Sequence, residues 1–179
     1  RDPFGIRPLV IGKLNKSFIL ASETCALDIV GASFVREVEN GEIVVVENNE
    51  INSIKPFPKQ KARPCIFEYI YFARPDSLID GRCAYEYRKN FGIQLAKEAD
   101  IDADIVVPVP DSGVPAALGY AEHSGKKFEL GLIRNHYVGR TFIEPSQNIR
   151  SLGVKLKLSP TKSIVKNKSI ILIDDSLVR

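Results

Sequence analysis

Two adjacent carboxylates stand near the end of the sequence, followed by a hydroxyl and an arginine: Asp174, Asp175, Ser176 and Arg179. They come directly after the apolar run 170–173, whose Ile and Leu residues predict a strand buried on both faces of a parallel sheet. Open α/β sheets bind ligands at the carboxyl ends of their strands. Neighbouring carboxylates at that edge suit a bound cation or the hydroxyls of a sugar.

A second candidate site follows another apolar stretch, residues 105–110, and is formed by Asp111, Ser112 and Gly113. Asp111 or Ser112 can cap the helix expected next, which has Pro115 in its first turn and Gly125 at its end. Free backbone amides at such a helix N-terminus can bind an anion. Many α/β units share this pattern without binding phosphate, so the pattern alone leaves both possibilities open.

Residues 134–168 are unusually basic, with eight Lys or Arg residues and one acid, Glu144. This excess favours either a polyanionic ligand or a solvated loop. The stretch has little regular pattern, and a long irregular loop of this kind is usually a functional lid or disordered. The net charge of the whole chain is only +3, which does not indicate a nucleic-acid partner.

With 179 residues the chain could be one domain or parts of two, and its 44% hydrophobic residues suffice for a core. Three widely spaced cysteines without a CxxC pair, and no secretory segment, predict a reduced, cytoplasmic protein. No apolar run approaches the roughly 20 residues of a membrane span, so no membrane association is expected. The order strand, helix, strand, loop, strand after residue 104 predicts a doubly wound sheet that binds a nucleotide or sugar phosphate.

The first part of the chain predicts a different architecture. Residues 1–55 are β-rich, with hairpins at 9–21 and 42–54 and a short helix at 22–29. Residues 55–65 hold three prolines and four positive charges, which predicts an extended linker at 56–65 and a domain boundary there. Beyond it, residues 66–72 predict a packed strand. Residues 83–99 predict a helix whose apolar stripe is Ala84, Tyr87, Phe91 and Leu95.

Four stretches together resemble a known family. Residues 171–179, Ile-Leu-Ile-Asp-Asp-Ser-Leu-Val-Arg, are similar to the phosphoribosyl pyrophosphate (PRPP) signature of type I phosphoribosyltransferases, without the Gly-Thr-Thr that normally follows. Residues 1–9, residues 67–77, and residues 135–143 with Pro145 and Gln147 look like those of glutamine PRPP amidotransferases. The resemblance covers nearly the whole chain, and the combination of motifs is far more specific than any one of them.

The resemblance implies an α/β fold in two parts. Residues 1–55 would be the C-terminal part of an N-terminal-nucleophile (αββα) glutaminase domain. Residues 66–179 would be the first half of a type I phosphoribosyltransferase parallel-sheet domain. Enzymes of this family release ammonia from glutamine and transfer it to PRPP, displacing pyrophosphate. The product is 5-phosphoribosylamine, in the first committed step of de novo purine biosynthesis. The glutaminase cysteine would lie upstream of Arg1, so both sites are incomplete and the piece itself is expected to be inactive.

The resemblance also implies residue roles. Asp174 and Asp175 would bind Mg²⁺ and the ribose hydroxyls, and the 5-phosphate loop would begin with Ser176, Leu177, Val178 and Arg179. The pyrophosphate loop would be Asp111, Ser112 and Gly113. A flexible loop that closes over PRPP would contribute Tyr137, Arg140 and Ile143. One of Tyr69 and Tyr71 would line the channel for ammonia.

The sequence departs from the family pattern at several positions. Arg134-Asn135-His136 stands where many members have Lys-Asn-Arg, and Gly113 replaces a hydroxyl that helps to bind the metal in some relatives. Cys65 matches the first ligand of the [4Fe–4S] cluster present in some members, although a plain buried thiol is the alternative.

Partners and alternative functions follow from the same resemblance. PRPP and glutamine would be the substrates, purine nucleotides the feedback inhibitors, and the full-length enzyme a homo-oligomer, expected to be a tetramer. The alternatives are another type I phosphoribosyltransferase that acts on a nucleobase and a non-enzymatic regulator that binds PRPP. The motifs at residues 1–9 and 74–77 argue against a simple transferase, because it needs no glutaminase.

Overall fold

The computed structural model describes residues 1–137 and 154–176, in two compact units. The N-terminal unit is Arg1–Tyr87 and the C-terminal unit is Arg88–Arg179. Each unit is held by a hydrophobic core of its own. No helix in the described ranges is both long and apolar enough to cross a bilayer.

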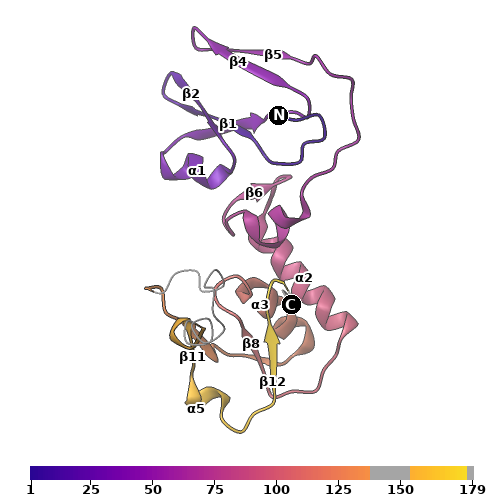
Figure 1. Cartoon of the computed structure of the whole chain (residues 1–179), viewed down its shortest axis with the longest axis vertical. Helices are drawn as coiled ribbons and strands as arrows, with labels where there is room; N and C mark the ends of the chain where they lie inside the picture. The colour runs from indigo at the N-terminus through magenta and orange to yellow at the C-terminus, as the bar shows by residue number, and fades with distance from the viewer. Residues whose placement is uncertain (138–153, 177–179) are drawn as a thin grey trace, which may run out of the picture. The chain divides into compact units, whose positions relative to one another are not determined.

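The N-terminal unit begins with a three-stranded antiparallel sheet in the order β2-β1-β3 (Figure 1). Its strands are β1 (Val10–Leu14), β2 (Ser17–Ala21) and β3 (Ser33–Glu37), and the helix α1 (Thr24–Ile29) packs against them. A Cβ on Gly12 would lie 2.5 Å from a methyl carbon of Leu27, so the glycine lets α1 approach β1 closely. The predicted first hairpin and short helix are confirmed.

The second predicted hairpin is also confirmed, as β4 (Ile43–Glu47) and β5 (Glu50–Ile54). Its two-residue turn consists of Asn48 and Asn49, with φ of +50° and +62°. Both values are those of a type I′ turn, the tight turn whose twist matches that of the strands, and asparagine tolerates this left-handed conformation.

Residues 55–65 have no helix or strand, as the linker prediction requires. The predicted strand at 66–72 is wrong, because Glu68–Phe72 forms a π-helical turn, η1. The aromatic residues alternate with the period of a strand, but in the helical turn Phe67 meets Tyr71 edge to face, with ring centroids 5.7 Å apart. The short strands β6 (Leu78–Ile79) and β7 (Arg82–Cys83) follow as a hairpin.

The compact units divide between Tyr87 and Arg88, not at the predicted linker. Residues 74–78 are bound to α1 through Glu23 and Thr24. Glu23 accepts hydrogen bonds from the Arg74 amide (2.7 Å) and the Ser77 hydroxyl (2.8 Å), and the Leu78 amide donates to the Thr24 hydroxyl (2.8 Å). The assignment of 1–55, 56–65 and 66–179 to functional domains stays a prediction.

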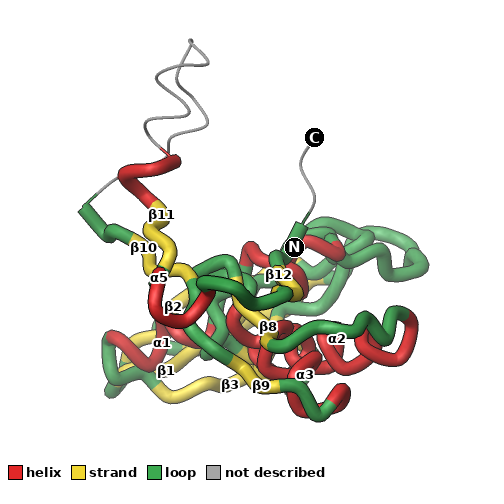
Figure 2. The backbone as a smooth tube through the Cα atoms, turned by 90° about the horizontal axis from the view of Figure 1, so that it is seen from below, coloured by secondary structure: helices red, strands yellow, loops and turns green. Residues whose placement is uncertain are grey.

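The C-terminal unit contains the predicted parallel sheet, in the order β12-β8-β9. Its strands are β8 (Ile105–Pro108), β9 (Lys127–Phe128) and β12 (Ile170–Ile173), and both pairings are parallel. Figures 1 and 2 show β8 and β12 side by side. The helix α3 (Val114–Ser124) connects β8 to β9, begins with Pro115 in its first turn and ends at Gly125, which has a φ of +68°.

The two central strands differ in burial. All four residues of β8 are buried, whereas β12 alternates, with Ile170 39% and Leu172 57% exposed. The prediction that the last strand is buried on both faces is therefore wrong. Within the described residues β12 pairs with β8 on one side only, so it lies at the edge of this sheet.

The helix predicted at 83–99 is present as α2 (Ala84–Glu98), but its apolar stripe is not the one expected. Phe91 and Leu95 are exposed, whereas Gly92 and Ala96 are buried. A Cβ on Gly92 would lie 1.8 Å from the Ala116 carbonyl oxygen, and one on Gly119 would lie 2.0 Å from the Lys89 carbonyl oxygen. The helices α2 and α3 thus touch through backbone, which only glycine permits.

The basic stretch contains regular elements. It holds β11 (Leu158–Pro160), which pairs antiparallel with β10 (Leu132–Arg134), and the short helix α5 (Lys162–Val165). The expectation of an irregular loop over the whole of 134–168 is therefore too broad.

Candidate functional site

The predicted carboxylates follow β12 directly, at the carboxyl end of the parallel sheet. The Asp175 amide donates to Asp174 Oδ1 at 2.8 Å, and Asp175 Oδ1 accepts a hydrogen bond from the Ser176 hydroxyl at 3.0 Å. Partial desolvation raises the pKa of the Asp174 carboxyl above its ordinary value; the Asp175 amide opposes this shift, and the negative charge of Asp175 adds to it.

The predicted anion-binding turn lies against the same strand end. The Val109 amide donates to the Ile173 carbonyl oxygen at 2.7 Å, which joins the turn to the last residue of β12. A Cβ on Gly113 would lie 2.5 Å from the same carbonyl oxygen and 2.9 Å from that of Val109. The structure therefore brings the turn and the two acids to one edge of the sheet, and it leaves no room for a side chain at Gly113.

The predicted helix cap is wrong. The N-cap of α3 is Gly113, and neither Asp111 nor Ser112 caps the helix with its side chain. The Asp111 carboxylate instead accepts a hydrogen bond from Arg134 in β10, with 2.6 Å between Oδ2 and Nη1. Arg134 Nε is buried and has no hydrogen-bond partner among the described residues. The sequence does not predict this pair, because 23 residues separate its members; its only signal is the charge excess that begins at Arg134.

The donor set fits a magnesium ion. Mg²⁺ usually binds through one or two carboxylates plus substrate oxygens and water, and Asp174 and Asp175 supply such a pair. A cation there would offset the repulsion that contributes to the raised pKa of Asp174. Within residues 1–137 and 154–176, no three His, Cys, Asp or Glu side chains gather into a complete ligand set.

The described residues alone do not provide the ligands of an iron–sulfur cluster. Cys65 is half-buried with a free thiol, and its amide donates to the Ile6 carbonyl oxygen at 2.9 Å. The described part of the chain offers Cys65 no set of sulfur ligands, so the residues present do not make an iron–sulfur site.

The structure does not bring the remaining predicted residues that it describes into the site. Tyr137 is fully exposed. Arg140, Ile143, Leu177, Val178 and Arg179 lie outside the described residues. Tyr69 is half-buried, and its hydroxyl donates to Asp80 at 2.5 Å, whereas Tyr71 is exposed. Desolvation and this hydrogen bond both raise the pKa of Tyr69, so its phenol stays protonated at neutral pH.

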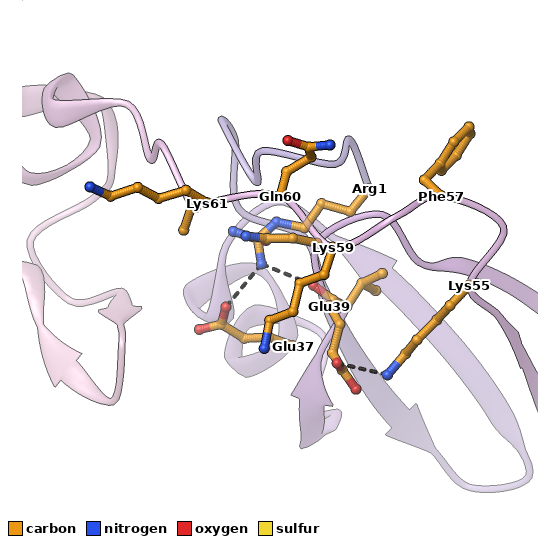
Figure 3. A pocket seen from close by; sticks show the side chains of 11 residues that line it. Arg1, Glu37, Glu39, Lys55, Phe57, Lys59, Gln60 and Lys61 are labelled. Carbon is orange, nitrogen blue, oxygen red and sulfur yellow. Dashed lines mark hydrogen bonds and ion pairs between the residues drawn. The ribbon is translucent and has the colours of Figure 1, made fainter.

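A separate hollow of about 650 Å³ lies in the N-terminal unit and contains none of the predicted site residues (Figure 3). It is formed by Arg1, the end of β3 and the residues that follow β5. Arg1 points to Glu37 at 3.2 Å and Lys55 to Glu39 at 2.8 Å. Lys59 and Lys61 also line the hollow, so its wall carries a net positive charge despite these two ion pairs.

Comparison with known proteins identifies the relatives of the chain. It is 59% identical, over its whole length, to the amidophosphoribosyltransferase of Rhizobium etli and 55% identical to the chloroplastic amidophosphoribosyltransferase of Glycine max. The chain belongs to the amidophosphoribosyltransferase family. No family model matches it.

Solved amidophosphoribosyltransferase structures show the same fold. The glutamine PRPP amidotransferase of B. subtilis, complexed with ADP and GMP, aligns to 99% of the chain with a TM-score of 0.89 and 49% identity. A structure described as the allosteric regulatory enzyme of purine biosynthesis gives the same TM-score at 50% identity. These results confirm the predicted family and fold class. The chain spans 37% and 32% of the lengths of the Rhizobium and Glycine amidophosphoribosyltransferases.

Proposed function

We propose that a protein of full family length carrying this sequence transfers ammonia, released from glutamine, to PRPP and displaces pyrophosphate to give 5-phosphoribosylamine. The proposal rests mainly on the shared edge of the sheet, where Asp174 and Asp175 follow β12 and the Gly113 turn contacts the Ile173 carbonyl oxygen. In a chain of this family, one edge thus combines acids for a cation and a sugar with a turn for a diphosphate.

The chemistry asks for charge stabilisation more than for acid–base catalysis. PRPP loses pyrophosphate as its C1 becomes oxocarbenium-like, so the leaving anion must be stabilised. Magnesium bound by Asp174 and Asp175 would supply part of that stabilisation. The acids also orient the ribose hydroxyls, and the N-terminus of α3 directs its dipole at the leaving anion.

Several further properties belong to the same proposal. We infer that the full-length protein binds purine nucleotides as feedback inhibitors, which the ADP and GMP named with the B. subtilis relative support. Glutamine is the ammonia donor, the protein is cytoplasmic, and it assembles as a homotetramer. Cys65 is a cluster ligand only if sulfur ligands come from outside the described residues.

The Asp174→Asn variant tests the proposal in the full-length protein. We expect PRPP-dependent synthesis to fall at least about 100-fold, because removal of a group that stabilises transition-state charge typically costs a factor of that order. Basal glutamate release from glutamine should remain. Phosphoribosylamine formation and glutamate release are measured side by side, with Asp102→Asn as the control, because Asp102 is an exposed acid of the same unit. Unchanged synthesis in Asp174→Asn would contradict the proposed role.

A further inference from the structure

The ion pair between Asp111 and Arg134 joins two parts of the site that the proposed function must use. Asp111 lies in the turn before α3, where the diphosphate of PRPP is expected. Arg134 is the last residue of β10 and is held in register by its pairing with Leu158 of β11. The adjacent amide of Asn135 donates to the Lys157 carbonyl oxygen at 2.8 Å, which also fixes the backbone there. The guanidinium is thus presented to the turn by an ordered strand pair.

The Asp111 carboxylate accepts a hydrogen bond from only part of the Arg134 guanidinium. Nη1 donates to Asp111 Oδ2 at 2.6 Å, but the buried Nε finds no hydrogen-bond partner among the described residues. A buried donor without an acceptor costs free energy, so a ligand that supplies a second oxygen is favoured over Asp111 alone. The planar fork of arginine suits two oxygens of one phosphate, which a point-charge lysine at this position would not hold in the same way.

We propose that the Asp111 carboxylate is a built-in competitor of the diphosphate group for the Arg134 guanidinium, and that it thereby sets the affinity of the site for PRPP. The inference rests on the proposed function. The backbone of the turn receives the diphosphate, while the Asp111 side chain must release Arg134 as the ligand enters. Asp111 is therefore a specificity-determining residue and not a ligand of the metal.

The solvent exposure of the ion pair determines how large the change in PRPP affinity should be. The Arg134 side chain is 35% exposed and that of Asp111 57% exposed, so the pair belongs to the class of partly solvated ion pairs that contribute little. Removing the charge of Asp111 should therefore tighten PRPP binding by about two- to fivefold.

The test is a double-mutant cycle in the full-length protein, with the dissociation constant of PRPP in the presence of Mg²⁺ measured by calorimetry. Asp111→Asn should tighten binding and lower KM by about two- to fivefold. In an Arg134→Gln background the same Asn substitution should tighten binding less, because only the direct repulsion between the carboxylate and the diphosphate is then removed. Equal tightening in both backgrounds would contradict the inference. Asp111→Glu, which keeps the charge, should restore the affinity of the original protein, and the distant Asp102→Asn control should leave it unaltered.

Each other outcome has a definite meaning. If Asp111→Asn weakens binding, and does so with or without Arg134, the carboxylate touches the ligand or its cation and the inference is wrong. If the affinity does not change while the original protein binds PRPP, the inference alone fails. If the original protein does not bind PRPP at all, the proposed function fails and the inference falls with it.

Discussion

Two carboxylates in this chain show opposite pKa shifts. Glu42 is fully buried, yet its pKa is lowered to about 2, chiefly because Arg36 donates to it at 2.6 and 2.9 Å. The pKa of Asp174 is raised, because partial desolvation is not offset by a cationic side chain. A carboxylate that the protein neutralises internally is structural, whereas one left in an unfavourable environment at a sheet edge suits an incoming cation.

Glu42 should therefore matter for stability. Its carboxylate also accepts hydrogen bonds from the Ser53 hydroxyl at 2.7 Å and the Glu39 amide at 2.6 Å. Glu42→Gln should lower the free energy of unfolding by about 3 kcal/mol at pH 7, the lower end for breaking a buried ion pair, because Arg36 is partly exposed. Urea unfolding of the N-terminal unit measures the loss, and Glu50→Gln at the exposed start of β5 is the control.

The effect of Glu42 should depend on pH in a stated direction. The folded-state pKa is depressed, so this stabilisation is fully present above the ordinary value of 4.5 and is lost as the pH falls toward about 2. The difference between the original protein and Glu42→Gln should shrink across that window. A difference of the same size at pH 7 and at pH 2.5 would show that the charge of Glu42 contributes nothing.

At the scale of elements, short sequence signals predicted the elements whose ends or apolar faces they mark clearly. The hairpins, α3 with its Pro115 start and Gly125 end, and the parallel pairing of β12 were foreseeable, because turn residues and apolar runs specify them. The helical turn at Glu68–Phe72 was not, since alternating aromatic residues fit a strand equally well. The exposure of Leu172 was also hidden, because the burial of a strand depends on which neighbours it has.

The same division holds for the candidate site. Adjacent acids after an apolar run, and a turn before a helix, are visible as short motifs, so Asp174 and Gly113 could be found from the sequence. The contact of Arg134 with Asp111 could not, because it depends on how β10 lies relative to the turn. The hydrogen bonds from residues 74–77 to Glu23 span more than 50 residues, and the sequence does not predict them for the same reason.

The packing of α2 on α3 depends on glycine. Gly119→Ala would place a Cβ 2.0 Å from the Lys89 carbonyl oxygen, so the helices must separate. In an open helix this change would stabilise by up to about 1 kcal/mol, but overpacking against backbone costs roughly 1–3 kcal/mol. We expect a net loss, measured by thermal unfolding. Asn90→Ala on the exposed surface of α2 is the control, with a change within about 0.5 kcal/mol. Increased stability of Gly119→Ala would contradict the close contact.

At the scale of the whole molecule, the chain is built from two units with separate cores. The core of the N-terminal unit includes Val10, Leu27 and Ala32, whereas that of the C-terminal unit gathers around Val106, Tyr120 and Ile171. The helix α2 begins in the first unit and continues into the second. Separate cores allow one unit to lose local stability while the other keeps its hydrogen bonds.

Native-state hydrogen exchange can test this independence. Glu42→Gln should accelerate exchange in β3, β4 and β5 while leaving β8 and α3 protected, because the lost ion pair lies wholly within the N-terminal unit. Gly119→Ala should instead accelerate exchange in β8, in α3 and in the part of α2 beyond Arg88, and leave the N-terminal unit protected. The double variant should show the sum of the two effects, since the sites share no partners. Equal loss of protection in both units from either single substitution would mean that they unfold as one cooperative body, with α2 as the element that couples them.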